Sequence, residues 1–202
     1  MTNLTKLFVW EHLKLAFPRF EDAEIISGWG EDAEYLRNLD TAVAYPKGKD
    51  WDTGEGYSSQ HDTRFFHFNV RTIGDDRLVG FVAVHGIEWN NRSGSLSVAI
   101  GEPGDRNKGY GQEALKLILR YAFHELNLDR VGLEVIEYNK SGIRAYGKVG
   151  FRHEGRKRAA VYRDGKRYDL LIMGILRREW EAMYLPYSWK QGEGSGGTGS
   201  FN

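Results

Sequence analysis

Residues 96–126 read LSVAIGEPGDRNKGYGQEALKLILRYAFHEL, and this stretch decides the fold. Apolar residues alternate up to Ile100, as in a β-strand, and then recur at helical spacing over residues 111–126. The sequence RNKGYG, residues 106–111, joins the two patterns where a helix exposes unpaired N–H groups and the positive end of its dipole. Its two glycines let a ligand approach the backbone closely, and its arginine and lysine add cationic donors. The junction therefore predicts a phosphate or pyrophosphate site.

Two other phosphate motifs fit this junction less well. A P-loop requires a lysine and a serine or threonine directly after its second glycine, and they are absent here. The dinucleotide fingerprint G-x-G-x-x-A is present as Gly109, Gly111 and Ala114, with Asp129 at about the right distance. However, eight residues separate Ile100 from Gly109, whereas the fingerprint glycines directly follow their strand. We interpret this match as a coincidence.

The segments around the junction predict a mixed sheet. Upstream, three strands are expected at residues 66–71, 78–87 and 96–100, and the short turns between them are typical of an antiparallel meander. Downstream, the sequence predicts a strand at 131–136, a helix at 139–149, a strand at 151–162 and, after the turn Asp164-Gly165, a strand at 168–176. This order predicts an α/β fold, with a central, mostly antiparallel mixed sheet flanked by helices.

The N-terminal part predicts a short strand followed by two helical segments. The strand, residues 13–17, ends at Pro18, which suits the first turn of a helix. We expect that helix to bury its apolar side chains, namely Phe20, Ala23, Ile25 and Ile26. A second helical segment is expected at 29–39. The polar stretch 41–63 then predicts a long loop, which in a compact domain often faces a substrate.

Length and composition indicate one globular domain. The 202 residues predict a single domain over residues 1–190, and the Gly- and Ser-rich residues 191–202 predict a disordered tail. Four aromatic residues cluster just before this tail: Trp180, Tyr184, Tyr187 and Trp189. They predict an element docked on the core, with a homodimer contact as the alternative.

Several classes of function are excluded or disfavoured by composition. The absence of cysteine excludes disulfides, thiolate metal sites and a cysteine nucleophile. The six histidines lack the paired spacing of metal ligands, so no metal is expected. Basic and acidic residues balance at 28 each, which argues against a stable nucleic-acid partner. The first apolar run, residues 7–10, is too short for a signal peptide or a membrane span, so we expect a cytoplasmic protein without a membrane partner.

A resemblance to a known superfamily follows from several motifs in order. Residues 106–111 resemble R/Q-x-x-G-x-G/A, the acyl-CoA motif of the GNAT N-acetyltransferases. The superfamily's L-E-V…N-x-x-A/S…Y-x-K-x-G-F segment is matched at unbroken spacing by Leu133-Glu134-Val135, Asn139, Gly142, Tyr146 and Lys148-Val149-Gly150-Phe151. The helix opening near Asp22 and the ending around Tyr168 look like the ribosomal-protein, RimJ/RimL-like branch. The resemblance spans residues 13–180.

The resemblance implies a seven-stranded sheet split into a V, with acetyl-CoA lying in the split. It implies that the pyrophosphate is held by the backbone N–H groups of Lys108, Gly109, Tyr110, Gly111 and Gln112, and that Arg106 and Asn107 beside them also bind the cofactor. It further implies that the main chain of Ile100 contacts the acetyl-bearing arm. Asn139 is expected to cap its helix and to hydrogen-bond the CoA.

The implied reaction is transfer of an acetyl group from acetyl-CoA to a primary amine by direct attack. The acceptor is expected to be a protein N-terminus, a polyamine, an amino acid or an aminoglycoside. Direct attack needs no protein nucleophile, and the chain has neither a cysteine nor a G-x-S-x-G elbow. The alternative function is a non-catalytic acyl-CoA-binding or nucleic-acid-binding module that retains the fold.

Two side chains are candidates for the proton transfers of this reaction. The resemblance implies that Tyr146 lies near the thioester sulfur, where its phenol can donate to the departing thiolate. Glu134, twelve residues earlier, is the candidate base, although a glutamate on a strand is also commonly paired with a nearby arginine or lysine. Further candidate bases are His85, Glu88 and Glu102.

A basic cluster is expected on the last hairpin. It comprises Arg152, Arg156, Lys157, Arg158, Arg163, Lys166 and Arg167. We interpret it as a solvated face. Contacts to the 3′-phosphate of the CoA or to an acidic acceptor are the alternatives.

Overall fold

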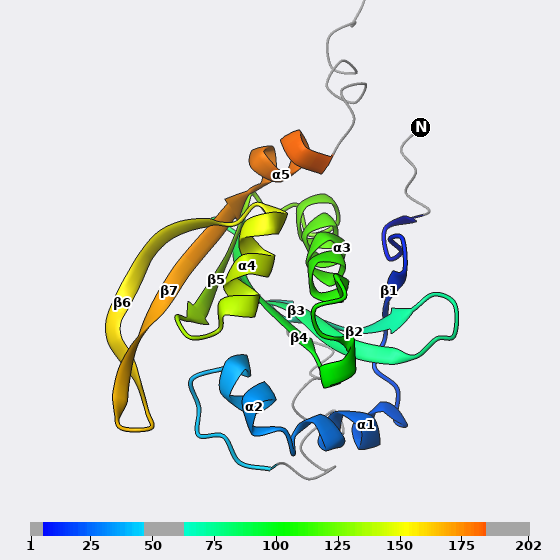
Figure 1. The fold of residues 1–202 in the computed structure, drawn as a ribbon. Coiled ribbons are helices and arrows are strands. Elements are labelled where there is room, and N and C mark those ends of the chain that lie inside the picture. Colours follow the sequence, from blue (N-terminus) through cyan, green and yellow to red (C-terminus); the bar gives the residue numbers. More distant parts are fainter. Residues whose placement is uncertain (1–5, 47–62, 185–202) are drawn as a thin grey trace, which may run out of the picture.

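The computed structural model describes residues 6–46 and 63–184 (Figure 1). The helices are α1 (Asp22–Trp29), α2 (Ala33–Leu39), α3 (Tyr110–His124), α4 (Lys140–Val149) and α5 (Arg177–Tyr184), with a 3-10 turn, η3, at Pro103–Asp105. The strands are β1 (Leu13–Ala16), β2 (Phe66–Thr72), β3 (Leu78–Glu88), β4 (Ser93–Ile100), β5 (Arg130–Ile136), β6 (Arg152–Arg163) and β7 (Lys166–Leu176). The predicted order of elements is confirmed.

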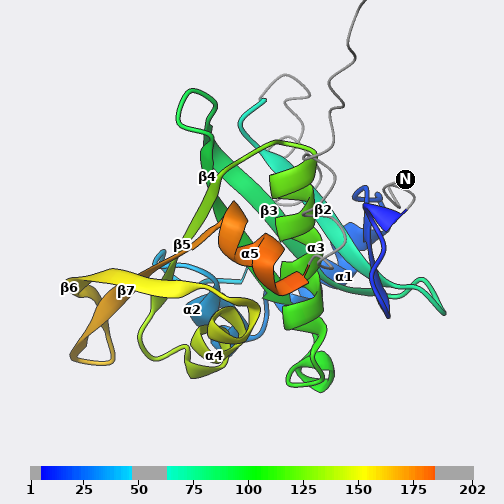
Figure 2. The same ribbon diagram turned by 90° about the horizontal axis from the view of Figure 1, so that it is seen from above.

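The strands form one seven-stranded sheet in the order β1-β2-β3-β4-β5-β7-β6. Every neighbouring pair is antiparallel except β4 and β5. These two strands pair in parallel only over Ser93–Ser95 and Arg130–Gly132, although β4 continues to Ile100 and β5 to Ile136. The sheet therefore splits halfway along β4, as the family resemblance implied (Figures 1 and 2).

The main core lies between the sheet and α3. The apolar stripe predicted for this helix is buried, and Leu115, Ile118 and Leu119 have no exposed surface. They pack in one cluster with residues of β1 to β5, β7 and α5. Helix α4 lies beside α3, next to the split (Figure 1). Burial of this much apolar surface is the main force that fixes α3 against the sheet.

Helices α1 and α2 use a second, smaller cluster on the opposite face of β4. Leu96 and Val98 belong to the main core, whereas Ala99 packs with Trp29 and Tyr35. Side chains alternate between the two faces of a strand. The α1–α2 segment therefore covers the face of β4 that α3 does not cover.

The prediction that the first helix buries its apolar side chains is wrong for Ile25 of α1 and for Phe20, which lies before α1. Phe20 is 87% exposed and Ile25 is 42% exposed, whereas Ala23 is buried as expected. The cause is Asp22, which is only 1% exposed and forms an ion pair with the buried Arg71 of β2. Because a buried carboxylate must face its cationic partner, this pair decides which side of α1 points inward.

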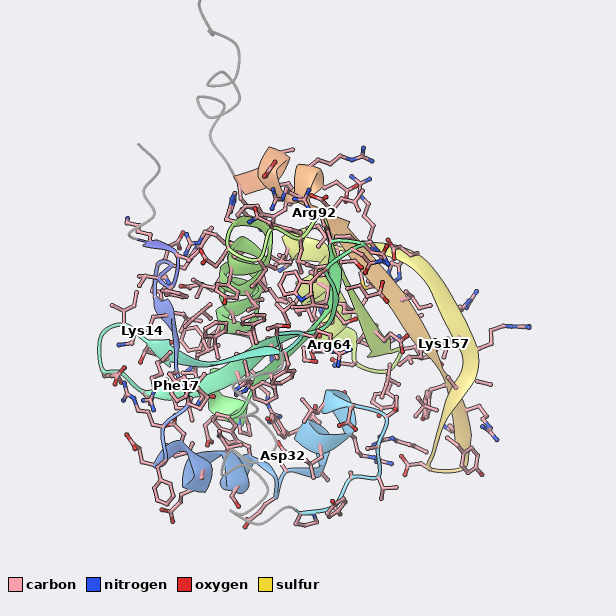
Figure 3. All side chains as sticks on the ribbon, turned by 180° about the vertical axis from the view of Figure 1, so that it is seen from behind. Lys14, Phe17, Asp32, Arg64, Arg92 and Lys157 are labelled. Atoms are coloured by element: carbon pink, nitrogen blue, oxygen red, sulfur yellow. The ribbon has the colours of Figure 1, made fainter. Side chains whose placement is uncertain are left out.

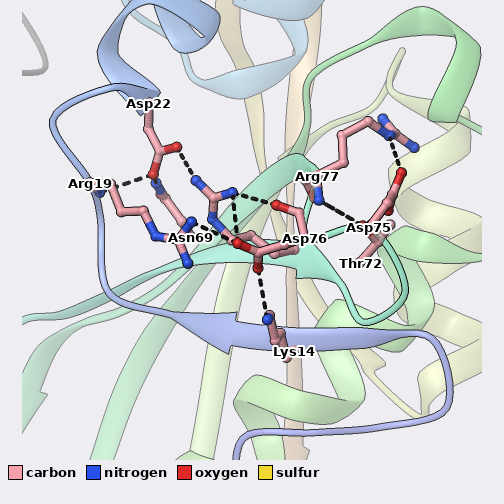
Figure 4. A network of polar contacts seen from close by, with 9 residues as sticks. Lys14, Arg19, Asp22, Asn69, Thr72, Asp75, Asp76 and Arg77 are labelled. Carbon is pink, nitrogen blue, oxygen red and sulfur yellow. Dashed lines mark hydrogen bonds and ion pairs between the residues drawn. The ribbon is translucent and has the colours of Figure 1, made fainter.

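The ion pair belongs to a polar network at the turn between β2 and β3 (Figure 4). The Asp22 carboxylate also accepts a hydrogen bond from Asn69 Nδ2 at 2.7 Å. At the turn itself, Asp76 forms ion pairs with Lys14 and Arg19, both at 2.7 Å. These two partners hold the pKa of Asp76 down to about 2. The network thus joins β1, α1 and the turn after β2 through directional contacts.

The C-terminal aromatic segment docks on the core over the part that the structure describes. Trp180 is 1% exposed and contacts Phe123 of α3, and Tyr184 meets Trp10 edge to face. Tyr187, Trp189 and the expected tail at 191–202 lie outside the described residues, as do residues 47–62 of the expected long loop. Within the described residues, no helix is both long enough and apolar enough to cross a membrane.

Candidate active site

A cavity of about 400 Å³ opens at the split of the sheet. Its walls come from α2, the second half of β4, the loop between η3 and α3, the first turns of α3, and α4. It is lined both by Val98, which faces the main core, and by Ala99, which faces α1 and α2. The cavity therefore reaches both faces of the sheet through the gap beside β4.

The loop before α3 forms a cradle of main-chain amides at one side of this cavity. Gly109, the residue before the helix, has φ +92°, a left-handed conformation that favours glycine. No side chain caps the helix, and the first helical bond described here runs from Glu113 N–H to Gly109 O at 3.0 Å. The N–H groups of residues 110–112 thus have no acceptor within the helix. A Cβ at Gly109 would meet nothing within 4 Å, so the cradle is open to a ligand.

Most of the predicted CoA-binding residues line the cavity. They are Ile100, Arg106, Asn107, Gly109, Gly111, Gln112 and Asn139. Two others are not in its lining: Lys108 is exposed, 3.7 Å from Asp105, and Tyr110 packs against the main core. Asn139 caps α4, because its Oδ1 accepts a hydrogen bond from Gly142 N–H at 2.9 Å. The spacing of the sequence motifs thus brings distant residues to one cavity.

Arg106 lies in the cavity wall with its guanidinium already engaged. Nη2 is 2.7 Å from Asp32 Oδ2 and donates to Gly101 O, also at 2.7 Å. Asp32 in turn caps α2, accepting from Glu34 N–H and Tyr35 N–H. Burial raises the pKa of Asp32, but the hydrogen bond from Arg106 outweighs this effect, together with those from the α2 backbone, and the pKa lies below its usual value. This interaction between the loop and α2 was not predicted from the sequence.

Tyr146 lines the cavity from α4 and is 9% exposed. Its ring packs edge to face on Phe151, the residue that ends the predicted motif. Burial raises the pKa of Tyr146 to about 12. The phenol is therefore protonated throughout the neutral range, which is the state of a hydrogen-bond donor.

The candidate bases lie outside the cavity lining. Glu134 is exposed on β5, and its Oε1 lies 2.5 Å from Lys157 Nζ of β6. Figure 3 shows Lys157 on the outer hairpin.

Glu102 accepts a hydrogen bond from Trp29 Nε1 at 2.9 Å. His85 Nε2 lies 2.9 Å from Ser97 Oγ, and burial lowers the pKa of this histidine. A fourth candidate, Glu88, accepts from Asn91 Nδ2.

The basic hairpin is largely paired rather than free. Arg156 lies 3.4 Å from Asp169, and Arg152 lies 3.0 Å from Glu179. Arg163 donates to main-chain oxygens at Asp40 and Ala42. These pairings favour the interpretation as a solvated face.

Sequence reasoning missed several residues of the cavity. Arg144 and Lys148 line it from α4, and among the described residues neither has a carboxylate within ion-pair distance. Their spacing of four along a helix places them on one face, a signal that the sequence contained. Tyr35 and Asn38 of α2 also line the cavity. No motif pointed to them, because α2 meets the cavity only through tertiary packing.

A sheet that splits beside a helix-end anion cradle is the arrangement that the resemblance implied for a transferase that uses acyl-CoA. In agreement, the acetyltransferase (GNAT) domain family matches residues 12–152. The chain belongs to this family, whose members take the acetyl group from acetyl-CoA. The predicted family, fold and enzyme class are confirmed. Among the described residues, no cluster of three metal-ligating acidic or histidine side chains is found.

Individual relatives agree with this assignment. The prophage-derived N-acetyltransferase YokL of Bacillus subtilis is 28% identical over 172 residues, covering 85% of this chain and 95% of the relative. YdaF of the same bacterium, named as a ribosomal N-acetyltransferase, is 31% identical over 107 residues, covering 53% of this chain and 58% of the relative. The spermidine N-acetyltransferase of Vibrio cholerae, solved with CoA and spermine, superimposes with a TM-score of 0.74 at 23% identity, covering 83% and 97%. The last similarity concerns the fold.

Proposed function

We propose that this acetyltransferase acetylates a primary amine that enters the cavity from the α2 side, while the CoA enters from the side of α3 and α4. The observation that carries the proposal is the cavity at the split, because it joins the amide cradle to both faces of the sheet. Direct attack on a thioester needs two approaches that do not block each other. The cradle marks one approach, and α2 lines the other.

The residues around the cavity fit a CoA thioester. The open N–H groups of residues 110–112 suit a pyrophosphate, since the helix dipole adds to their attraction for an anion. Arg144 and Lys148 supply positive charge from α4. Beyond Ser95, the peptide groups of β4 that point towards β5 have no partner strand. Apart from Ile100 O, which accepts from Arg106 Nε, they are available to the amides of the acetyl-bearing arm.

The chemistry requires a neutral amine and a stabilised leaving group. The amine nitrogen attacks the thioester carbon and the C–S bond breaks. The nitrogen loses one proton to water and the departing thiolate gains one from water, so the products are the amide and the CoA thiol. The Tyr146 phenol, with a pKa of about 12, is a weaker acid than a thiol with a pKa of about 8.5. Its role is therefore to donate a hydrogen bond to the developing thiolate rather than to give up its proton completely.

The acceptor class is tested with a panel of amines. Spermidine, a peptide with a free N-terminus, free amino acids and an aminoglycoside are each incubated with acetyl-CoA, and released CoA thiol is measured together with the mass of the acceptor. We expect one class to release thiol well above the hydrolysis background and to gain one acetyl group. Tight CoA binding without turnover on any amine would instead favour the non-catalytic module.

Replacing Tyr146 by phenylalanine tests its assigned role. Loss of one hydrogen bond to a charged leaving group is expected to lower kcat about 10- to 100-fold. The dissociation constant of CoA should stay within about twofold, because Phe keeps the packing on Phe151. Steady-state kinetics and calorimetric CoA titration measure the two quantities. A large loss of CoA affinity with unchanged kcat would assign the phenol to binding.

The cytoplasmic location and the homodimer remain predictions from the sequence. Gel filtration with light scattering measures the oligomeric state directly.

A further inference from the structure

Arg106 belongs to the acyl-CoA motif, yet its contacts point away from the cradle. Its Nη2 contacts Asp32 and Gly101 O, and its Nε donates to Ile100 O at 3.4 Å. Its guanidinium also lies 5.9 Å from the centre of the Tyr35 ring. Both partners of the ion pair are largely shielded, with 23% and 29% of their side chains exposed. The guanidinium thus bridges the end of β4 and the beginning of α2.

These contacts use the donors that a phosphate would require. A guanidinium has five N–H donors in a fixed planar fork. Turning that fork towards the cradle would break the pair with Asp32 and leave the carbonyls of Ile100 and Gly101 without this donor. Arg144 and Lys148 line the same cavity, and within residues 6–46 and 63–184 they have no such contacts to give up. The α4 pair is therefore the better source of charge for an anion.

The partner of Arg106 defines which part of the cavity the contact controls. Asp32 caps α2, and the first turn of α2 carries Tyr35, which lines the cavity together with Asn38 one turn later. Figure 3 shows Asp32 at the beginning of α2. A shift of this turn moves the α2 wall, while the amides of residues 110–112 remain fixed by the buried helix α3.

We infer that Arg106 is a positioning residue for the acceptor: it fixes the α2 wall to the end of β4 through Asp32 and does not bind the CoA phosphates. The inference rests on the proposed function, because the α2 wall matters for catalysis only if the amine passes it. It assigns to the arginine of the motif a part in acceptor recognition.

Asp32→Asn is the sharpest test. Asparagine caps a helix as well as aspartate does, so α2 keeps its cap and loses the nearer of the two carboxylates beside Arg106. The other, Glu34, has its Oε2 3.9 Å from Nη1. We expect the KM for the acceptor to rise about tenfold, as for the loss of one charge-assisted hydrogen bond. The kcat at saturation and the dissociation constant of CoA should stay within about twofold, since the cradle is untouched.

Arg106→Gln and Arg106→Lys complete the set, with Arg144→Gln as the matched control. Lysine keeps the positive charge but lacks the planar set of donors. If Arg106 bound a phosphate, lysine should restore CoA binding, but it should not restore the bridge to Asp32, Gly101 and Ile100. We expect both Arg106 variants to raise the acceptor KM without weakening CoA. Arg144→Gln should weaken CoA binding and leave the acceptor KM unchanged. The double variant Asp32→Asn/Arg106→Gln should be no worse than either single change.

Two outcomes would overturn the inference. One is an Arg106→Gln protein that binds CoA as weakly as Arg144→Gln and recovers with lysine. The other is an Asp32→Asn protein whose acceptor KM is unchanged. CoA titration needs no acceptor, so it shows whether Arg106 binds the CoA phosphates even if no amine in the panel is acetylated. Failure of the proposed function is seen separately, as a wild-type protein that acetylates none of the amines.

Discussion

The two faces of the sheet are held by different forces. On the α3 face, one large cluster of fully buried aliphatic and aromatic side chains fixes the helix. On the α1–α2 face, the cluster of buried apolar residues is small, and the helices are held by ion pairs at their first turns. Asp22 pairs with Arg71 at the beginning of α1, and Asp32 pairs with Arg106 at the beginning of α2. Apolar packing is non-directional, whereas each ion pair requires one arrangement of its partners.

This difference suits the two tasks of the site. The cradle needs amides in fixed positions, and they stand on the helix with the largest apolar anchor. The α2 wall is held by a few polar contacts and can differ among relatives without disturbing the core. The comparison therefore predicts two kinds of effect on the free energy of unfolding. On the α1–α2 face, removing one partner of an ion pair removes the whole contribution of that pair. On the α3 face, the loss is proportional to the apolar volume removed.

The largest effect is expected from Asp22→Asn. The substitution keeps the shape of the side chain but leaves the Arg71 guanidinium, whose side chain is 6% exposed, without its counter-charge. Removal of one partner of a buried ion pair is expected to lower the free energy of unfolding by about 3–5 kcal/mol. Urea denaturation measures it, with Asp164→Asn as the control, since the pair of Asp164 with Arg37 is exposed. A loss as small as in the control would contradict the comparison.

A second prediction on this face concerns acid. The His67 ring lies between those of Phe65 and Phe81, and burial lowers its pKa to about 4. The unfolded chain binds the proton near pH 6.5 and the folded protein only near pH 4, so stability contributed by the neutral ring is lost as the pH falls through this window. The loss at pH 4 is about 3 kcal/mol.

Replacing His67 by phenylalanine removes this titration. The variant should lose less of its free energy of unfolding between pH 7 and pH 4 than the wild type, by roughly the same 3 kcal/mol. Other groups titrate in both proteins and cancel in the difference. Equal slopes with pH in the two proteins would show that folding does not lower the pKa of the histidine.

A graded effect is expected on the α3 face. Ile118 has no exposed surface, and Ile118→Val removes one methylene group from the main core. The free energy of unfolding should fall by about 1 kcal/mol, and CoA affinity and kcat should be unchanged. Thermal unfolding and CoA titration measure these quantities. Loss of CoA binding at equal folded fraction would mean that the cradle follows small changes in the core.

The same difference explains what could be predicted from the sequence. The helix at α3 and the junction at residues 106–111 follow from apolar periodicity and glycine spacing, which are local signals. The split of the sheet was implied only by the family resemblance. The burial of Phe20 and Ile25 was predicted by the same rule and is wrong, because Asp22 meets Arg71 across 49 residues of sequence. Contacts of this kind have no local pattern.

The candidate site divides in the same way. Gly109, Asn139 and Tyr146 line one cavity. The family resemblance implied a common site for them through motifs whose residues have defined positions on predicted helices. Asn38 and Tyr35 were missed because α2 reaches the cavity through tertiary packing alone. The engagement of Arg106 with Asp32 was missed for the same reason: the motif shows which residue is present, but not the partner that its side chain finds.

The smallest effect is expected from Glu134→Gln. Glu134 and Lys157 form a close ion pair, as Asp22 and Arg71 do, but this pair is not buried. The exposed fraction is 44% for the Glu134 side chain and 56% for the Lys157 side chain. Water screens such a pair, so the free energy of unfolding should change by less than about 1 kcal/mol. The kcat/KM should fall by less than about threefold at every pH, because the carboxylate is outside the cavity lining and the amine pKa governs the rate. A fall of about a hundredfold, with loss of the acidic limb of the pH profile, would make Glu134 the base and would show that an exposed ion pair opens during turnover.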